Sequence, residues 1–220
     1  MGSMKNIHVI YRGIDTKKFS YCFNENDSRL RILFIGGIPF YKHLEAGRNL
    51  KGGISLMNAW KNVEEKLFSL NCELIFAGPD ANSETALEWH HSLKHKSNVV
   101  LRGMLTPEDV MKEYRQAHVV VIPSLEEGMP NVALEAGATG KCLIASNVGG
   151  IPELITNKLN GVIIEPGDEV DLENALIFCA KDRIHVRKMG FKIRNVIESK
   201  FESKGFAEKY FEMYKKVLSN

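Results

Sequence analysis

The stretch "HVVVIPSLEEGMPNVALEAGATGKCLIAS" (residues 118–146) decides the fold class. It opens with an apolar run (118–123), passes through a turn rich in glycine and proline, continues into helix-forming residues (131–140) and closes with a second apolar run (142–146). Neither apolar run alternates with polar residues, which is typical of strands covered by helices on both faces of a parallel sheet. The stretch therefore predicts a strand, a helix and a second, parallel strand.

The rest of the chain repeats this alternation. Further strands are predicted at residues 31–37, 72–78, 98–103 and 161–165. Helices are predicted at residues 52–68, 82–96, 106–117, 168–182, 186–201 and 204–218. Thr106, followed by Pro107, has the residue types of an N-cap and a first helical position. About six strands that alternate with helices predict a doubly wound, Rossmann-like α/β domain with a parallel sheet.

Composition limits the classes of partner and compartment. The 220 residues carry a net charge of +2, so the bulk charge favours neither nucleic acid nor an acidic membrane as a partner. The four cysteines are far apart and form no metal or disulfide pattern, which fits the reducing cytoplasm. No apolar run approaches the ~20 residues of a membrane span. Residues 1–3 read as an expression scar, which leaves residues 4–220 as one expected domain.

Two loops at predicted strand ends carry chemistry, because ligands bind at the carboxyl ends of an open parallel sheet. The first loop, 36–53, contains Gly36, Gly37, Arg48 and Lys51 before a helix. A helix N-terminus offers free N–H groups and a partial positive charge, so the combination suits a diphosphate. The spacing is not that of a P-loop. A solvated surface loop remains an alternative on this loop alone.

The second loop is the turn after residue 122, flanked by two carboxylates. Glu127 precedes a predicted helix start at Pro130 and Asn131, and Glu135 lies about one turn inside that helix. A carboxylate accepts two hydroxyl hydrogen bonds, so both acids suit ribose or sugar diols. Alternatively, they are surface charges near a helix N-terminus. A glycosidase acid pair is a further alternative, which needs carboxyl groups about 5 to 9.5 Å apart.

The segment "SLEEGMPNVALEA" resembles the E-x7-E signature of retaining, nucleotide-sugar-dependent glycosyltransferases of the GT-B fold, family-4 type, with Glu127 and Glu135 at the acidic positions. "HVIYRGIDTKKF" (8–19) is similar to the segment that opens the C-terminal domain of that family. "NVVLRGMLTPEDVMKEYRQAHVVVIPS" and "GKCLIASNVGGIPELITNKLNGVIIEPGD" follow the family order. The resemblance covers roughly residues 7 to 215.

The resemblance implies a role for each matching residue. Glu127 would contact hydroxyls of the donor sugar, Glu135 the ribose, and Lys51 the phosphates. Glu127 and Lys51 would also activate the donor. The implied donor-binding residues are Gly36, Gly37, Arg48, Lys51, Arg102, Gly103, Glu127, Gly128, Met129, Pro130, Asn131, Val132 and Glu135. Among these, Arg102 and Gly103 fall where the nucleotide base rests in the family.

The first loop departs from the family pattern. The family usually has an arginine directly after the first-strand glycine, whereas Ile38 follows Gly37 here. Arg48 is the candidate to supply the missing charge, three residues before Lys51. The implied reaction is retaining hexosyl transfer from a nucleoside-diphosphate sugar, without a metal or other cofactor. The protein would stabilise the departing diphosphate electrostatically.

The resemblance also bears on partners and localisation. The chain corresponds to the C-terminal of two domains, so the acceptor-binding N-terminal domain is expected to be absent and the isolated chain to be inactive. The last predicted helix (204–218) resembles one that crosses back to that domain. The expected setting is cytoplasmic synthesis of a cell-surface polysaccharide or glycoconjugate. A sugar-nucleotide epimerase and a non-catalytic binding module remain alternatives.

Two further motifs have both a functional and an ordinary interpretation. His91 and His95 have the i, i+4 spacing of a metal pair, with His90 beside them. No acidic ligand completes such a site, so a solvated helix face is expected. The segment "RIHVRKMGFKIR" (183–194) combines basic and apolar residues. It either packs its apolar side on the core or contacts the inner membrane surface peripherally.

Overall fold

The computed structural model describes residues 10–22, 28–37 and 50–218. Its centre is a six-stranded, all-parallel sheet with the strand order β3-β2-β1-β4-β5-β6. The strands are β1 (Leu30–Ile35), β2 (Cys72–Ala77), β3 (Val99–Arg102), β4 (Val119–Ile122), β5 (Cys142–Ser146) and β6 (Val162–Ile164). Each predicted strand overlaps one of these, and the prediction of a doubly wound α/β fold is confirmed.

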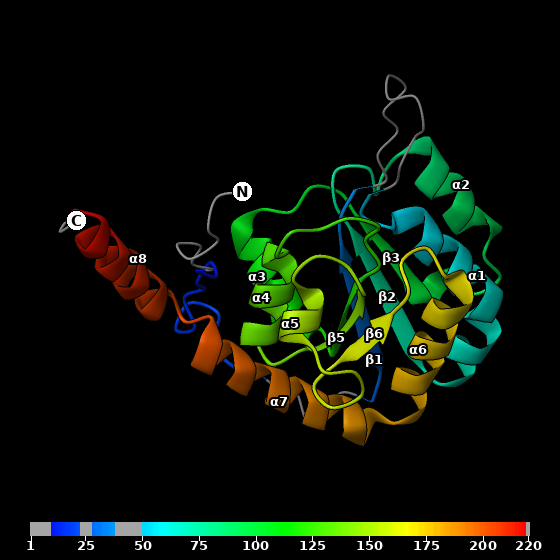
Figure 1. Cartoon of the computed structure of the whole chain (residues 1–220). Helices are drawn as coiled ribbons and strands as arrows, with labels where there is room; N and C mark the ends of the chain where they lie inside the picture. The colour runs from blue at the N-terminus through cyan, green and yellow to red at the C-terminus, as the bar shows by residue number, and fades with distance from the viewer. Residues whose placement is uncertain (1–9, 23–27, 38–49, 219–220) are drawn as a thin grey trace, which may run out of the picture.

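Helices cover both faces of the sheet. They are α1 (Gly53–Ser69), α2 (Glu84–Ser92), α3 (Pro107–Gln116), α4 (Asn131–Ala138), α5 (Ile151–Leu154), α6 (Glu169–Lys181), α7 (Arg183–Lys200) and α8 (Ser203–Leu218), with a 3-10 turn at Lys96–Asn98. Figure 1 shows α1, α2 and α6 on one side of the sheet and α3, α4 and α5 on the other. The Thr106 hydroxyl accepts the Asp109 N–H at 3.2 Å, which confirms the predicted cap of α3.

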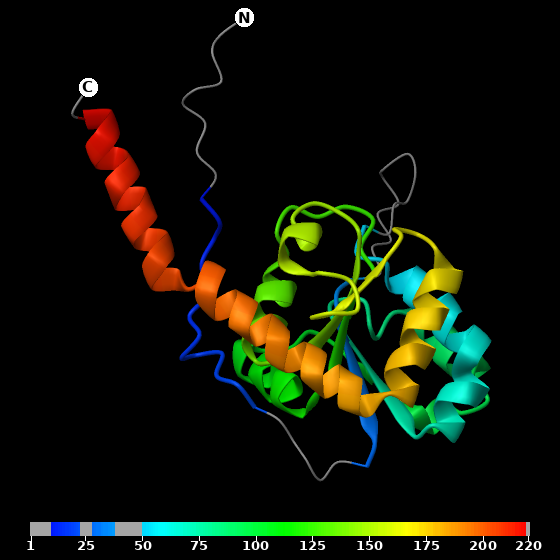
Figure 2. The same cartoon turned by 60° about the horizontal axis from the view of Figure 1, so that its bottom comes forward.

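The side-chain alternation of the strands divides the core into two layers. Ile32 and Phe34 belong to the layer under α1 and α6, whereas Leu33 belongs to the layer under α3 and α4. Helix α7 contributes to both layers, with Val186 and Met189 in one and Ile193 and Ile197 in the other. It therefore crosses from one face of the sheet to the other, as Figure 2 shows from below.

The strand order places a crevice between β1 and β4. From β1 the chain moves outward through β2 to β3, and it then returns to β4 on the opposite side of β1. The connections that follow β1 and β4 therefore lead to opposite faces of the sheet. Such a switch point opens a crevice at the carboxyl ends of the two strands, where ligands of open α/β sheets bind.

The first described segment is fixed to the last two helices. The Ile14 N–H donates to the Phe201 carbonyl at 2.7 Å, and the Ser203 N–H donates to the Ile14 carbonyl at 3.0 Å. Beyond this bridge, α8 extends away from the sheet (Figures 1 and 2) and none of its described side chains is buried. The segment 10–22 therefore lies against the body of the fold, whereas α8 does not.

The prediction of one helix over residues 82–96 is wrong beyond Ser92. The Lys94 N–H donates to the Glu64 carboxylate at 3.1 Å, so a tertiary contact replaces the helical hydrogen bond. His95 consequently lies outside the helix, where its Nε2 atom is 2.7 Å from Glu65 Oε2. His91 and His95 therefore do not share a helix face. The four-residue α5 was not predicted, because so short a helix has no periodic pattern.

Candidate functional site

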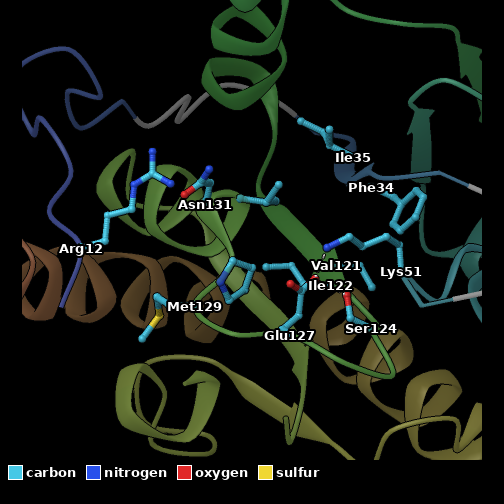
Figure 3. A pocket seen from close by; sticks show the side chains of 12 residues that line it. Arg12, Phe34, Ile35, Lys51, Val121, Ile122, Ser124, Glu127, Met129 and Asn131 are labelled. Atoms are coloured by element: carbon cyan, nitrogen blue, oxygen red, sulfur yellow. Dashed lines mark hydrogen bonds and ion pairs between the residues drawn. The ribbon is translucent and has the colours of Figure 1, made fainter. Parts of the chain in front are cut away.

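A cavity of about 380 Å³ lies at the carboxyl ends of β1 and β4 (Figure 3). Its lining residues are Arg12, Phe34, Ile35, Lys51, Val121, Ile122, Ser124, Glu127, Met129, Pro130, Asn131 and Val132. Four apolar side chains come from the ends of β1 and β4, and three come from the turn after β4 and the start of α4. The polar side chains come from the segment before β1, the loop before α1, the turn after β4 and the start of α4. The cavity thus occupies the switch point of the sheet, where the strand order predicts a ligand site.

The loop before α1 is pressed against the turn that follows β4. Gly52 has φ +70°, and a Cβ atom there would lie 1.8 Å from the Pro123 carbonyl oxygen. Only glycine allows this approach, because it has no Cβ and tolerates a positive φ. The Leu125 N–H also donates to the Leu50 carbonyl at 2.8 Å. These backbone contacts place Lys51, which lies between Leu50 and Gly52, beside the turn.

Lys51 and Glu127 form an ion pair at the cavity. Lys51 Nζ is 2.7 Å from Glu127 Oε1, and the Ser124 hydroxyl donates to the same oxygen at 2.9 Å. The Glu127 side chain is 10% exposed, whereas that of Lys51 is 50% exposed. The carboxylate is therefore held in place by two donors from separate loops. The ammonium group retains donors for a ligand.

The other side of the turn is supported by the loop after β5. Gly149 has φ +53°, and a Cβ atom there would lie 2.1 Å from the Glu127 carbonyl oxygen. The Gly150 N–H donates to the Gly128 carbonyl at 2.6 Å. A Cβ atom on Gly150 would meet the Met129 methyl at 2.6 Å. The turn is thus packed between two glycine-containing loops, which fix its backbone.

Helix α4 begins at the cavity without a side-chain cap. Its N-cap is Pro130, which gives no side-chain hydrogen bond, and its first turn contains no acidic residue. The N–H groups of Asn131 and Val132 form no hydrogen bond within the described part of the chain. Both residues line the cavity. The positive end of the helix dipole and two available donors therefore face the ligand space.

Glu135 lies deeper, between α4 and α3. The hydroxyl of the fully buried Tyr114 donates to Glu135 Oε2 at 3.0 Å. Burial raises the pKa of Glu135, and the hydrogen bond from Tyr114 and the charges of Lys18 and Arg12 oppose this shift. Burial and the adjacent carboxylate raise the pKa of Tyr114. Glu135 is close to the cavity in sequence but is not among the residues that line it.

The remaining predicted residues lie outside the cavity lining. Arg102 ends β3, and its Nε atom is 3.6 Å from Glu113 Oε1. Next to it, Gly103 lies close to the Asn82 amide, which a Cβ atom on Gly103 would meet at 2.7 Å. Neither residue lines the cavity. Arg48 falls outside the described residues.

The two glycines after β1 lie directly at the end of that strand. The Gly36 N–H donates to the Ala77 carbonyl at 2.9 Å, which continues the pairing of β1 with β2. A Cβ atom on Gly37 would lie 3.2 Å from Asp80 Oδ2. Gly128, in the second loop, has no neighbour within 4 Å of such an atom. None of these three glycines lines the cavity, and among them only Gly128 has open space where a Cβ atom would stand.

Sequence reasoning missed two polar residues of the lining. Ser124 directly follows a predicted strand, so its position at a strand end could have suggested it. Arg12 belongs to the segment before the first strand, and nothing in the local pattern predicts its approach to the cavity. In the described residues, no three or more His, Cys, Asp or Glu side chains gather into a group suited to a metal ion. None of the described helices is long and apolar enough to cross a membrane.

The fold and the site define a Rossmann-like domain with a ligand crevice at its switch point. Residues 29–182 match the family described as Glycosyl transferases group 1, and the chain belongs to that family. It is 28% identical over 217 residues to an Escherichia coli UDP-Gal:alpha-D-GlcNAc-diphosphoundecaprenol alpha-1,3-galactosyltransferase, an alignment that covers 97% of this chain and 55% of the enzyme.

Two solved structures show the same fold. A glycosyltransferase from Rickettsia africae matches 99% of this chain and 59% of its own, with 20% identity and a TM-score of 0.82. HepE from Anabaena, solved in complex with UDP-glucose, matches 97% of this chain and 57% of its own, with 18% identity and a TM-score of 0.76. The chain thus spans little more than half the length of these relatives.

Proposed function

We propose that this chain is the donor-binding part of a retaining hexosyltransferase that uses a nucleoside-diphosphate sugar. The observation that carries the proposal is the switch-point cavity, where Lys51 and the uncapped start of α4 offer positive charge and free N–H donors. A diphosphate suits such a site. UDP-hexoses are the first donors to test, because HepE was solved in complex with UDP-glucose and the name of the Escherichia coli enzyme includes UDP-Gal.

In the proposed mechanism, electrostatics activates the donor. Lys51 and the N–H groups of Asn131 and Val132 bind the diphosphate and stabilise the negative charge that grows as it departs. Glu127 contacts sugar hydroxyls, for which the Lys51–Glu127 pair must open or share its ammonium group with the ligand. Glu135 binds the ribose. The Lys51 ammonium group performs the charge neutralisation, so the proposal includes no metal ion or other cofactor.

The glycine-rich loops and the β3 end complete the proposed donor site. The backbone of Gly128 and Met129 continues the anion-binding turn, and Gly36 and Gly37 let the ligand approach the end of β1 closely. Arg102 and Gly103, at the end of β3, bind the nucleotide base. This assignment requires the base to extend beyond the cavity toward β3.

Calorimetric titration of the 220-residue chain with UDP, GDP and ADP tests the donor site. We expect one nucleoside diphosphate to bind, and Lys51→Ala and Glu135→Ala each to weaken it about tenfold or more. Two matched controls should bind as the wild type does. They are Lys66→Ala, on the helix that follows the Lys51 loop, and Glu126→Ala, in the same turn as Glu127. The assignment fails if no nucleotide binds at millimolar concentration, or if both site variants bind normally.

We also propose that an acceptor-binding domain in the rest of the protein packs against α8. Tyr210, Phe211 and Tyr214 are exposed on this helix, and the relatives are about twice as long as the chain. Transfer of the sugar then requires both this chain and the acceptor-binding domain, so the isolated chain binds the donor without transferring its sugar. The names of the relatives favour a transferase over an epimerase or a non-catalytic module. An assay of full-length protein for hexosyl transfer and for epimerised nucleotide sugar distinguishes these alternatives.

Peripheral contact with the cytoplasmic membrane is part of the proposal. Helix α7 buries one side in the core, yet Ile184 is 71% exposed and Phe191 54% exposed, beside the exposed Lys188 and Lys192. Apolar and basic side chains together suit an anionic membrane surface. The acceptor would then be lipid-linked and the product a cell-surface polysaccharide or glycoconjugate.

Co-sedimentation with vesicles tests this contact. We expect the wild-type chain to bind phosphatidylglycerol-containing vesicles but not pure phosphatidylcholine vesicles. The double change of Ile184 and Phe191 to serine should abolish the binding, whereas Val170→Ser, at an exposed position on α6, should leave it unchanged. Equal sedimentation of the double variant and the wild type would rule out this surface.

A further inference from the structure

The net charge of the cavity lining depends on Arg12, which belongs to neither of the two loops predicted to bind the ligand. Of the 12 lining residues, only Arg12, Lys51 and Glu127 carry a charge. Lys51 and Glu127 form an ion pair at 2.7 Å and cancel each other. Arg12 therefore gives the described lining its net positive charge. Without it, a multiply charged anion would enter a cavity whose described lining has no net charge.

The side chain of Arg12 is placed to meet a ligand. Figure 3 shows Arg12 and Lys51 on opposite sides of the cavity, with Asn131 at the start of α4 between them. Arg12 is exposed and forms no hydrogen bond or ion pair with any described residue. Its charge nevertheless acts on Glu135, whose pKa it lowers. The guanidinium group thus keeps its donors available in a fork that fits phosphate oxygens.

The backbone of Arg12 is fixed although its side chain is unpaired. The Tyr11 hydroxyl donates to Glu153 Oε2, in α5. On the other side, Gly13 lies so close to α8 that a Cβ atom would stand 2.5 Å from Ser203 Cα. One residue that flanks Arg12 is therefore bonded to α5, and the other lies against the start of α8. This arrangement positions an arginine at the cavity wall and leaves its charged end for a ligand.

We infer that Arg12 binds the diphosphate of the donor from the wall opposite Lys51. The inference rests on the proposed function and deepens it, because it assigns the second cation of the diphosphate site. The two cations and the N-terminus of α4 then surround the anion on three sides. Sequence reasoning gave this charge to Arg48, whereas the inference gives it to Arg12, whose segment is bonded to the junction of α7 and α8.

Charge removal at one position, with a matched control, tests the inference. The probe is whichever of UDP, GDP and ADP the wild-type chain binds most tightly, together with its uncharged nucleoside. Arg12→Gln should weaken the diphosphate about tenfold, since a charge-assisted hydrogen bond is lost at an exposed site. Arg12→Lys should recover part of this loss. Lys17→Gln removes the same charge from the same segment, away from the cavity, and should change binding less than about twofold.

The outcomes separate this inference from the proposed function. If Lys51→Ala weakens the diphosphate while Arg12→Gln binds it as the wild type does, the role of Arg12 is wrong and the donor site stands. If Arg12→Gln weakens the nucleoside as much as the diphosphate, Arg12 contacts the nucleoside and the inference is also wrong. If the wild type binds none of the three diphosphates, the proposed function itself fails. Thermal melting of Arg12→Gln should match the wild type, because Arg12 makes no bond within the described fold.

Discussion

Arg194 should be one of the most important residues for the stability of this chain. Its side chain, on α7, ties the segment 10–22 to the sheet domain. The residue is only 9% exposed, and its guanidinium group donates to the backbone carbonyls of Phe19 at 2.7 Å, of Thr16 at 3.2 Å and of Ala138. Replacing it by methionine keeps most of the apolar volume and removes every donor. Three carbonyl groups then lose this donor.

The size of the effect follows from these contacts. Hydrogen bonds from a charged donor are worth about 1.5–3 kcal/mol each, and a buried group left unsatisfied costs about 1–3 kcal/mol. The bonds to Phe19 and Ala138 are the buried ones, so we expect Arg194→Met to lower the free energy of unfolding by about 3–5 kcal/mol. For a chain of this size, that loss lowers Tm by about 6–20 °C.

Urea unfolding followed by circular dichroism measures this change. Lys192→Met is the matched control, because Lys192 is exposed on the same helix and its loss should cost less than about 0.5 kcal/mol. Arg194→Lys should recover one of the bonds and therefore part of the stability. A loss below about 1 kcal/mol for Arg194→Met would show that the segment is held in some other way, and would refute the reasoning.

Three further predictions concern single side chains. Burial raises the folded-state pKa of Glu135, so its carboxylate destabilises the fold at neutral pH. Glu135→Gln should therefore melt higher than the wild type at pH 7, and this difference should vanish as the pH falls below about 4. Burial lowers the pKa of Lys141 to about 8 from 10.5, so the fold favours the neutral amine. In urea titrations, the wild type should therefore gain stability relative to Lys141→Met as the pH rises from about 8 to 10.5. Thr106→Ala should remove the cap of α3 and cost about 1 kcal/mol in the same unfolding assay, whereas Thr106→Ser should retain the cap.

The sheet was predictable because its signals are local. The predicted strand at residues 142–146 coincides with β5, since a short apolar run that follows Gly140 and Lys141 and ends before Asn147 leaves little ambiguity. Helix α2 was predicted too long, because residues 93–96 retain a helical composition. A contact from Glu64, 30 positions earlier, ends the helix instead. Sequence patterns do not contain such distant contacts.

The candidate site was predictable to the extent that it follows strand ends. Lys51 and Glu127 were assigned to separate loops, and the structure brings them to 2.7 Å. Arg12 could not be assigned to the cavity, because its place depends on how the segment 10–22 folds back on α7 and α8. The roles given to Arg102 and Gly103 stay predictions, since both lie outside the cavity lining.

The close approach of Gly52 and Gly149 to the turn affects how mutational scans of this chain should be interpreted. Neither residue has a side chain, yet almost any substitution at either one would displace the backbone that carries Lys51 or Glu127. A scan for loss of function would therefore rank both glycines with the residues that touch ligand. Their sensitivity would extend to alanine, the mildest substitution, whereas residues whose side chains contact ligand should tolerate chemically similar replacements. Comparing the two patterns of tolerance distinguishes residues that shape the site from residues that bind in it.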